Sequence, residues 1–245
     1  MLKIEKAVLP SYYQWKIIIE GMRNPLNSWD RMDSGKCNFD CRYCSRFDGC
    51  FNKGKHDYTI GNADHKLMMN LASKGSVHAK YRRMIPVFAT ITAPLYFWKE
   101  FDTYKVGTVS NSCSTMHKIH SKEFTLDDFS CEYLVPANIK LLEQVIENLN
   151  AARNEFICWD DSHFRIENDS QLVDRKVIWW QMIQLLPASY NQKRTVMLNY
   201  EVLSNIYHSR KDHKLDEWHT FCDWIKTLPY SDIITGVRDT ENKEV

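Results

Sequence analysis

The sequence predicts a helix-rich α+β chain that folds as one domain. Apolar residues recur at helical spacing in its second half, as at Ile139, Leu142, Ile146 and Leu149. Few segments have the pattern of a strand, and the clearest is the apolar run at residues 87–91. The 245 residues contain no internal repeat and no long linker, and this length is enough to bury one substantial core.

The order of the elements follows from capping and breaking residues. Residues 11–23 mix strand and helix signals before the break at Asn24-Pro25, and Asn62 or Asp64 is predicted to cap the next helix. Helices are expected over residues 62–73, 95–101, 136–149, 171–186, 196–209 and 215–228, with a short helical turn from Thr125. The domain is predicted to span residues 1–238, with a cysteine-rich insertion at 35–58 and a charged, disordered tail at 239–245.

An aromatic helix and a polar run meet within residues 91–117. Leu95, Trp98 and Phe101 mark the helix, and small hydroxyl and amide side chains crowd around Gly107 in the polar run. Such side chains compete with the backbone for hydrogen bonds and favour caps and turns. Beside an apolar helix, this run predicts either the polar wall of a pocket or an ordinary polar connection.

The bulk composition gives no indication of several classes of partner. A net charge of +1 gives no electrostatic reason to expect a nucleic acid or an acidic membrane surface as partner. No apolar run approaches the ~20 residues that a membrane span needs, and the N-terminus lacks a signal-peptide core. The eight cysteines are therefore expected in the cytoplasm, where clustered thiols more often hold metal than form disulfides.

Four cysteines form the densest cluster of metal-ligand residues in the sequence. Cys37, Cys41, Cys44 and Cys50 lie within fourteen residues, and CNFDCRYC has the spacing of the cluster loop in radical S-adenosylmethionine enzymes. The repeated strand–helix units that such an enzyme needs are not found in the pattern. A structural zinc site is the expectation, with His56 as an alternative ligand. A loop without metal and an iron–sulfur cluster are the alternatives.

Three segments of the chain together carry a resemblance to a known family. His78 precedes VFATITAPLYFWKEFD, and the next residues, 103–116, read TYKVGTVSNSCSTM. They stand where the flavin-dependent thymidylate synthases have a histidine, a strand and helix, and the motif R-H-R-x-x-S-x-N-E-x-S-x-R-Y. The third segment follows Leu186-Pro187 and resembles the family's later region. Asn199, Asn205 and Arg210 fall there at the family's spacings.

The resemblance covers about residues 74–116 and 180–220, under half of the chain. Most of the family's arginines are replaced: Arg-His-Arg is Thr103-Tyr104-Lys105 here, and the arginine of Asn-x-Arg is Glu201. Phosphate groups favour bidentate guanidinium contacts, for which lysine is a poor geometric substitute. The resemblance is therefore closer in fold than in active-site residues.

The resemblance implies a fold with a small antiparallel sheet, a homotetramer, and FAD as cofactor. It also implies reductive methylation of dUMP to dTMP, with methylenetetrahydrofolate as carbon donor and NADPH as hydride source. By this resemblance the flavin would be contacted by His78, Asn199 and Asn205. The nucleotide would be contacted by Lys105, Thr108, Asn111, Ser114 and Arg210. The candidate catalytic residues are Arg210 and Cys113.

Two other functions are also compatible with these residues. The replaced arginines suit a diverged flavoprotein that acts on another pyrimidine nucleotide. They also suit a catalytically inactive relative, a zinc-stapled module that binds nucleotides or regulates a partner.

Overall fold

The computed structural model describes residues 1–37, 58–160, 165–167 and 171–236. The chain divides into two compact units. Unit 1 comprises Met1–Ile4, Ile91–Thr103 and Asn111–Thr195, and unit 2 comprises Glu5–Thr90, Tyr104–Ser110 and Val196–Val245. Each unit is therefore built from segments that are distant in sequence.

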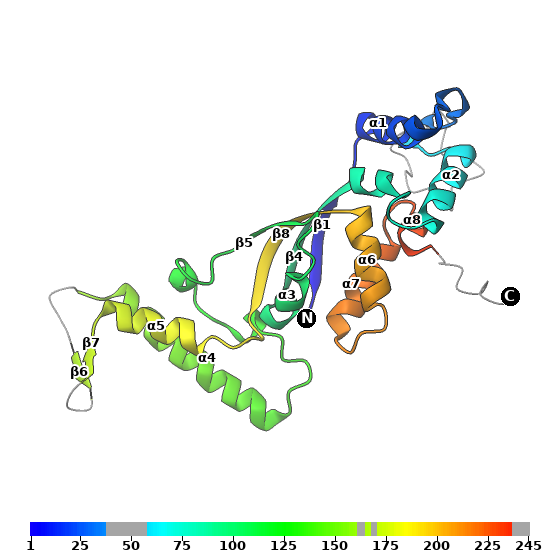
Figure 1. Ribbon diagram of the computed structural model, residues 1–245. Coiled ribbons are helices and arrows are strands. Elements are labelled where there is room, and N and C mark those ends of the chain that lie inside the picture. Colours follow the sequence, from blue (N-terminus) through cyan, green and yellow to red (C-terminus); the bar gives the residue numbers. More distant parts are fainter. Residues whose placement is uncertain (38–57, 161–164, 168–170, 237–245) are drawn as a thin grey trace. The chain divides into compact units, whose positions relative to one another are not determined.

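A four-stranded sheet with the order β1-β4-β8-β5 is the main β element (Figure 1). Its strands are β1 (Lys3–Val8), β4 (Pro86–Pro94), β5 (Val109–Ser112) and β8 (Asn191–Asn199). The chain passes from one unit to the other within each of these four strands. Together with the helices described below, this small antiparallel sheet confirms the predicted helix-rich α+β class.

Unit 1 has its core between two helices that lie side by side (Figure 1). Its elements are α3 (Leu95–Phe101), the 3-10 turns η6 (Ile119–Ser121) and η7 (Leu126–Asp128), α4 (Pro136–Ile157), the ribbon β6 (Arg165–Glu167) and β7 (Gln171–Val173), and α5 (Arg175–Leu185). Leu149 of α4 and Met182 of α5 are fully buried in one cluster with Phe124 and Phe129. The apolar spacing in 136–149 is thus the buried face of α4, because residues three and four apart share one side of a helix.

Unit 2 is made almost entirely of helices. Its elements are α1 (Tyr12–Arg23), the 3-10 turns η1 (Asn24–Leu26), η2 (Trp29–Arg31) and η5 (Lys80–Met84), the ribbon β2 (Gly35–Lys36) and β3 (Tyr58–Thr59), α2 (Asn62–Ser73), α6 (Tyr200–Arg210), α7 (Asp216–Lys226) and α8 (Asp232–Thr235). Trp15, Tyr200 and Tyr230 pack edge to face, with ring centroids of Trp15 6.4 Å and 6.0 Å from the other two. Aromatic contacts of this geometry stabilise the unit beyond the area that they bury.

Two predicted helices begin later than expected. Residues 196–199 belong to β8, and α6 starts at Tyr200 because the Asn199 side chain accepts a hydrogen bond from Val202 N at 3.0 Å. Residues 171–173 form β7, and α5 starts at Arg175 because Asp174 caps it in the same way through Val177 N. A cap side chain fixes the first helical turn, whereas apolar spacing alone does not.

The predicted caps of α2 are wrong. Gly61 is the N-cap, and Asp33, about thirty residues earlier, accepts hydrogen bonds from Ala63 N and Asp64 N at 2.8 and 3.0 Å. Asp64 instead lies fully buried beside the Nε of Arg23 at 2.5 Å. A side chain from another segment can satisfy the free N–H groups of a helix start, and sequence spacing does not reveal it.

One predicted helix and one predicted strand are confirmed, whereas the predicted domain boundaries are not tested. The helix at 95–101 and the strand at 87–91 are confirmed as α3 and as part of β4. Residues 38–57 of the predicted insertion and the tail at 239–245 lie outside the described residues, so the domain boundaries stay predictions. Within the described ranges, no helix has both the length and the apolar character to cross a membrane.

Candidate functional site

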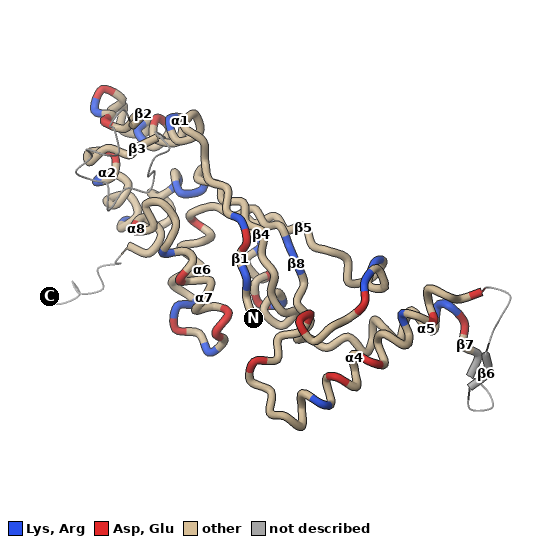
Figure 2. Tube along the Cα trace, turned by 180° about the vertical axis from the view of Figure 1, so that it is seen from behind, with Lys and Arg blue, Asp and Glu red and all other residues tan. Residues whose placement is uncertain are grey.

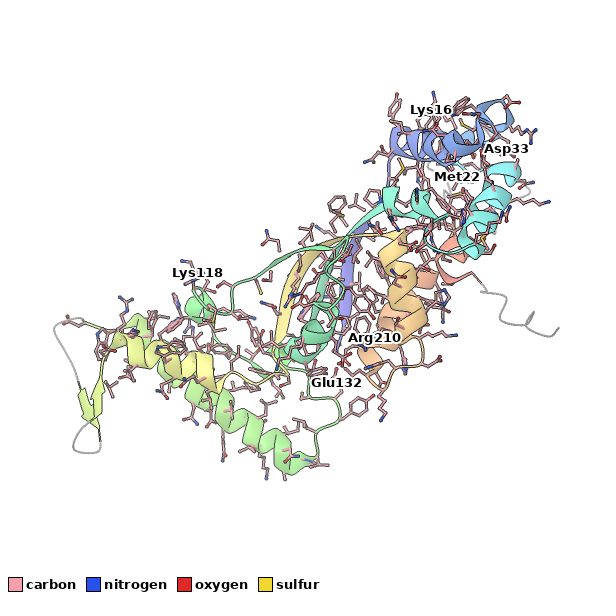
Figure 3. All side chains as sticks on the ribbon, viewed as in Figure 1. Lys16, Met22, Asp33, Lys118, Glu132 and Arg210 are labelled. Carbon is pink, nitrogen blue, oxygen red and sulfur yellow. The ribbon has the colours of Figure 1, made fainter. Side chains whose placement is uncertain are left out.

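In unit 2, residues 104–110 form a polar turn that packs along α6. At the C-terminal end of α6, Arg210 (labelled in Figure 3) donates from Nε to the Tyr104 hydroxyl at 2.9 Å. The guanidinium carbon of Arg210 lies 4.9 Å from the Trp218 ring centroid and 5.7 Å from that of Tyr104. Cation–π contacts and the hydrogen bond together fix this arginine. The two predicted segments, the polar turn and the later helix, therefore do meet.

At the other end of α6, the turn approaches the cap so closely that a side chain has no room. Gly107 has φ +81°, a conformation that L residues rarely adopt. A Cβ at this position would lie 2.9 Å from Asn199 Nδ2 and 3.1 Å from Val202 Cγ2. The backbone of the polar turn can reach the start of α6 only because residue 107 is glycine.

Two predicted nucleotide ligands lie on this turn. Thr108 Oγ1 is buried and has no hydrogen-bond partner in the described part of the chain. Lys105 is exposed, and its carbonyl accepts a weak hydrogen bond from Thr108 N at 3.4 Å. A buried hydroxyl without a partner costs free energy, which a ligand with a matching polar group would recover. The turn thus offers one unsatisfied hydroxyl and one exposed ammonium group.

The other predicted flavin ligands of unit 2 lie at exposed positions. His78 is in a turn after Gly75, and its backbone N donates to Gly75 O at 3.1 Å. Asn205 is exposed in the middle of α6, between two buried neighbours. Among the described residues, no hydrogen bond joins either side chain to Asn199. These imidazole and amide groups face solvent, where a ligand could reach them.

A buried ion pair of unit 2 is a feature that sequence reasoning missed. Arg82 Nε lies 2.8 Å from Glu201 Oε2, although the angles are not those of a hydrogen bond. Both side chains are about nine-tenths buried, and Arg82 Nη1 also donates to Ser204 Oγ and Ile233 O at 3.1 Å. Glu201 stands at the family's arginine position. A cation therefore still lies at this point of α6, but Arg82 supplies it from η5.

In unit 1, Cys113 is held at the end of β5 by two backbone hydrogen bonds. Its N donates to Lys193 O at 2.9 Å, and its carbonyl accepts from Gln192 Nε2 at 2.8 Å. The residue is exposed. The backbone is therefore fixed while the side chain remains open to a ligand.

Asn111 and Ser114 flank Cys113 in different ways. Asn111 is exposed on β5. Ser114 Oγ accepts hydrogen bonds from His117 N at 2.9 Å and Met116 N at 3.3 Å. The hydroxyl of Ser114 therefore stabilises a local turn, as serine commonly does.

Cys113 lies in a cleft of about 400 Å³ within unit 1, which we call the lysine cleft. The lining includes three lysines and two aspartates: Met1, Lys3, Thr92, Cys113, Lys122, Asp127, Asp128, Tyr190, Asn191 and Lys193. Burial, followed by the neighbouring Cys113 and Asp128, raises the pKa of Tyr190 to about 12. Its phenol therefore stays protonated at neutral pH and can donate a hydrogen bond in the cleft.

A second set of residues, also missed from sequence, stiffens the strand beside Cys113. Arg194 donates from Nη1 to Asp102 Oδ1 at 2.7 Å, and its guanidinium carbon lies 4.3 Å from the Trp98 ring centroid. Gln192 Oε1 accepts from Arg194 Nε at 2.9 Å. The buried Gln192 that bonds the Cys113 carbonyl is thus itself held in place.

The predicted metal site lies mostly outside the described residues. Cys37 is half-buried and not in a disulfide, while Cys41, Cys44, Cys50 and the alternative ligand His56 are not described. Within the described ranges, no three His, Cys, Asp or Glu side chains gather as metal ligands would. The zinc prediction stays a prediction.

Among known proteins, only solved structures show a similarity to this chain, and the similarity is one of fold. No protein-family model matches the sequence, and no curated protein matches it. The structure is similar to thymidylate synthase X (ThyX) from Helicobacter pylori with FAD and dUMP, with a TM-score of 0.55 and 13% identity over 95% of this chain and 94% of that chain. A second structure of that enzyme with FAD and dUMP gives 0.54 and 12% over 95% of both chains.

A third similar structure is the UMP/dUMP methylase PolB from Streptomyces cacaoi, bound with 5-Br dUMP. Its TM-score is 0.50 at 9% identity, over 96% of this chain and 93% of that chain. At such identities the likeness shows a shared fold. It extends over almost the whole chain, whereas the sequence resemblance covers under half of it.

Proposed function

We propose that this chain is a flavin-dependent enzyme of the thymidylate synthase type that modifies a pyrimidine nucleotide. The observation that carries the proposal is the shared fold over 95% of the chain with an enzyme that has been crystallised with FAD and dUMP. The packing of the polar turn of residues 104–110 along α6 supports it, since the resemblance places the ligand-binding residues on these two segments. The proposed reaction is reductive methylation of dUMP to dTMP, with methylenetetrahydrofolate and NADPH, in a cytoplasmic homotetramer.

The residues of unit 2 fit a flavin nucleotide in two respects. The Gly107 backbone leaves no side chain over the α6 cap, and His78 and Asn205 offer exposed polar groups. Bound FAD would supply the hydride chemistry. The chain itself would bind and orient the ring system through Asn199, His78 and Asn205.

For the nucleotide, the proposed contacts divide between cations and small polar groups. Lys105 is exposed and suits a phosphate, as a point charge rather than a bidentate donor. Arg210 would contact a carbonyl or anionic group from a position fixed by Tyr104 and Trp218. Among the small polar groups, Thr108 has a buried hydroxyl without a partner in the described part of the chain, and in unit 1, taken by itself, Cys113 and Asn111 are exposed.

The first test is the bound cofactor of the purified protein. A yellow protein with a flavin absorbance spectrum is the expected result, and FAD should be released on denaturation. Apoprotein should regain this spectrum when FAD is added, and dUMP should then perturb it. A protein that neither retains nor takes up FAD would overturn the proposal.

The second test separates the proposed reaction from a related one. Expression in a thymidine auxotroph should restore growth without thymidine if the enzyme makes dTMP. Failure of a well-expressed, flavin-loaded protein would overturn dTMP synthesis while leaving the flavoprotein assignment intact.

A second candidate function is a flavoprotein that acts on another pyrimidine nucleotide. It is favoured by Thr103, Tyr104 and Thr115, which stand where the resembled family has arginine, histidine and arginine. Titration of the FAD-loaded protein with UMP and with dUMP distinguishes the two, because spectral changes with UMP alone support this candidate. A colourless protein that contains zinc would instead support an inactive, zinc-stapled nucleotide-binding module.

A further inference from the structure

Unit 1 carries a cationic surface that the proposed enzymatic function does not use. A hollow of about 520 Å³ is lined by Phe156, Arg175, Lys176 and Trp179, which come from the end of α4 and the start of α5. We call it the cationic hollow. Figure 2 shows lysine and arginine (blue) on α5, and Lys118, on the loop before η6, is labelled in Figure 3.

Rings and cations alternate at the cationic hollow. The guanidinium carbon of Arg175 lies 4.7 Å from the centroid of the Phe156 ring. The centroid of the His120 ring also lies 4.7 Å from the Phe156 centroid. Arg153 donates from Nε to the His120 carbonyl at 3.0 Å. Trp179 is half-buried and anchored by its indole N–H, which donates to Met116 O at 3.0 Å.

The cations at this surface are not held in ion pairs within the described part of the chain, although the acidic Asp174 and Glu155 directly precede Arg175 and Phe156. Within the described ranges, no carboxylate forms an ion pair with Lys118, Arg153, Arg175 or Lys176. Partial burial and the charges of Lys118, Arg175 and Arg153 lower the pKa of His120. The Nδ1 atom of His120 is also buried without a hydrogen-bond partner among the described residues. Lys118, Arg153 and Arg175 are therefore close enough to act together on His120, although the whole chain has a net charge of only +1.

We propose that the cationic hollow binds single-stranded nucleic acid. Proteins that bind single strands combine cations that follow the phosphates with aromatic or guanidinium planes on which bases stack. Four cations on three elements exceed what one nucleotide phosphate needs, and the exposed Arg175 and Lys176 leave the hollow accessible. The net charge of +1 led us to expect no nucleic-acid partner, but the local distribution of charge is what decides binding.

The test uses the full chain and a fluorescein-labelled oligothymidylate of about 12 nucleotides, followed by fluorescence anisotropy. The wild type should bind it, and added salt should weaken binding. R175E/K176E should weaken binding about tenfold or more. Both positions are exposed in the first turn of α5, where glutamate also suits the helix dipole, so the fold should be kept.

The matched control is K74E/K140E, which makes the same change of net charge at two exposed positions that do not line the hollow. It should leave the affinity within about twofold of the wild type. Equal losses in the two double variants would show attraction by overall charge alone and would overturn the proposal. An unlabelled excess of dUMP should not compete, and full competition would show a mononucleotide pocket instead.

A second pair of variants tests stacking. Trp179→Phe and Trp179→Leu both lose the hydrogen bond to Met116 O, but only the first keeps a ring. Trp179→Leu should bind about fivefold more weakly than Trp179→Phe at equal thermal stability. Equal binding by the two variants would overturn the stacking part of the proposal.

Discussion

The buried ion pairs of unit 2 and the cationic hollow of unit 1 place arginines in opposite settings. In unit 2, Arg23 pairs with Asp64 and Arg82 with Glu201, and all four side chains are at least nine-tenths buried. In unit 1, Arg175 is exposed and faces an aromatic ring, and no described carboxylate pairs with it. A buried charge needs a partner because removal from water costs several kcal/mol, whereas an exposed cation does not. In the first setting each charge therefore depends on its partner, and in the second the arginine is available to a ligand.

Breaking the Arg82–Glu201 pair should give the largest effect. Glu201→Ala leaves the Arg82 guanidinium buried with Ser204 Oγ and Ile233 O as its acceptors among the described residues, and should lower the free energy of unfolding by about 3–5 kcal/mol. Urea unfolding followed by circular dichroism measures this. The double variant R82M/E201L removes both charges and should recover most of the loss. A double variant as unstable as Glu201→Ala alone would show that shape, rather than charge pairing, matters here.

Substitution of Gly107 should have an intermediate effect. Gly107→Ala introduces a Cβ 2.9 Å from Asn199 Nδ2 at a φ of +81°, and should destabilise the protein by about 1–3 kcal/mol. If the polar turn contacts the flavin, retention of FAD should fall with it. Gly35→Ala is the control, since no atom of the described residues lies within 4 Å of a Cβ there. Unchanged stability in Gly107→Ala would contradict the close packing of the turn on the α6 cap.

The smallest expected effect is a pH dependence that originates in unit 1. The pKa of His120 is lowered in the folded state from 6.5, so the unfolded chain takes up the proton first as the pH falls. The contribution of His120 to stability is therefore complete above about pH 6.5 and declines as the pH falls below it. The measurement is the thermal midpoint between about pH 7 and pH 5 for the wild type and for His120→Gln. The variant should show the shallower decline, and parallel curves would exclude His120 as the cause.

Bound nucleic acid should reverse part of this dependence. Phosphates near Lys118, Arg153 and Arg175 would offset the charges that lower the pKa of His120. Oligonucleotide binding should therefore tighten as the pH falls, and His120→Gln should weaken this trend. The same histidine thus links the stability of unit 1 to the ligand of the cationic hollow.

Local features of the site were predictable from sequence because their physical causes are local. Asn199 is of a residue type that favours N-caps and caps α6, although the sequence predicts a helix start at residue 196, and the short turn predicted from Thr125 is η7. Gly107 stands out in the polar turn because glycine permits positive φ. The helix α3 also follows from its own aromatic spacing.

Long-range features of the site were not predictable in this way. Two features cannot be recognised from a short stretch of sequence. One is the strand β8, whose burial alternates along a mostly polar sequence, and the other is the pairing of Glu201 with Arg82. Because Glu201 replaces an arginine of the motif, the sequence indicates that a cation is lost there. The structure shows that Arg82, from a distant segment, places a cation beside Glu201, which a motif alignment cannot show.

The sequence by itself determined the helix-rich α+β class, the starts of several helices, and the set of polar residues around Gly107, because propensity, capping and periodicity act over a few residues. Only the tertiary structure decided that the polar turn packs along α6, that Asp33 caps α2, and that Lys118, Arg153 and Arg175 gather around His120. Those outcomes depend on contacts between segments up to about a hundred residues apart, and burial and charge pairing select them only once the chain has folded.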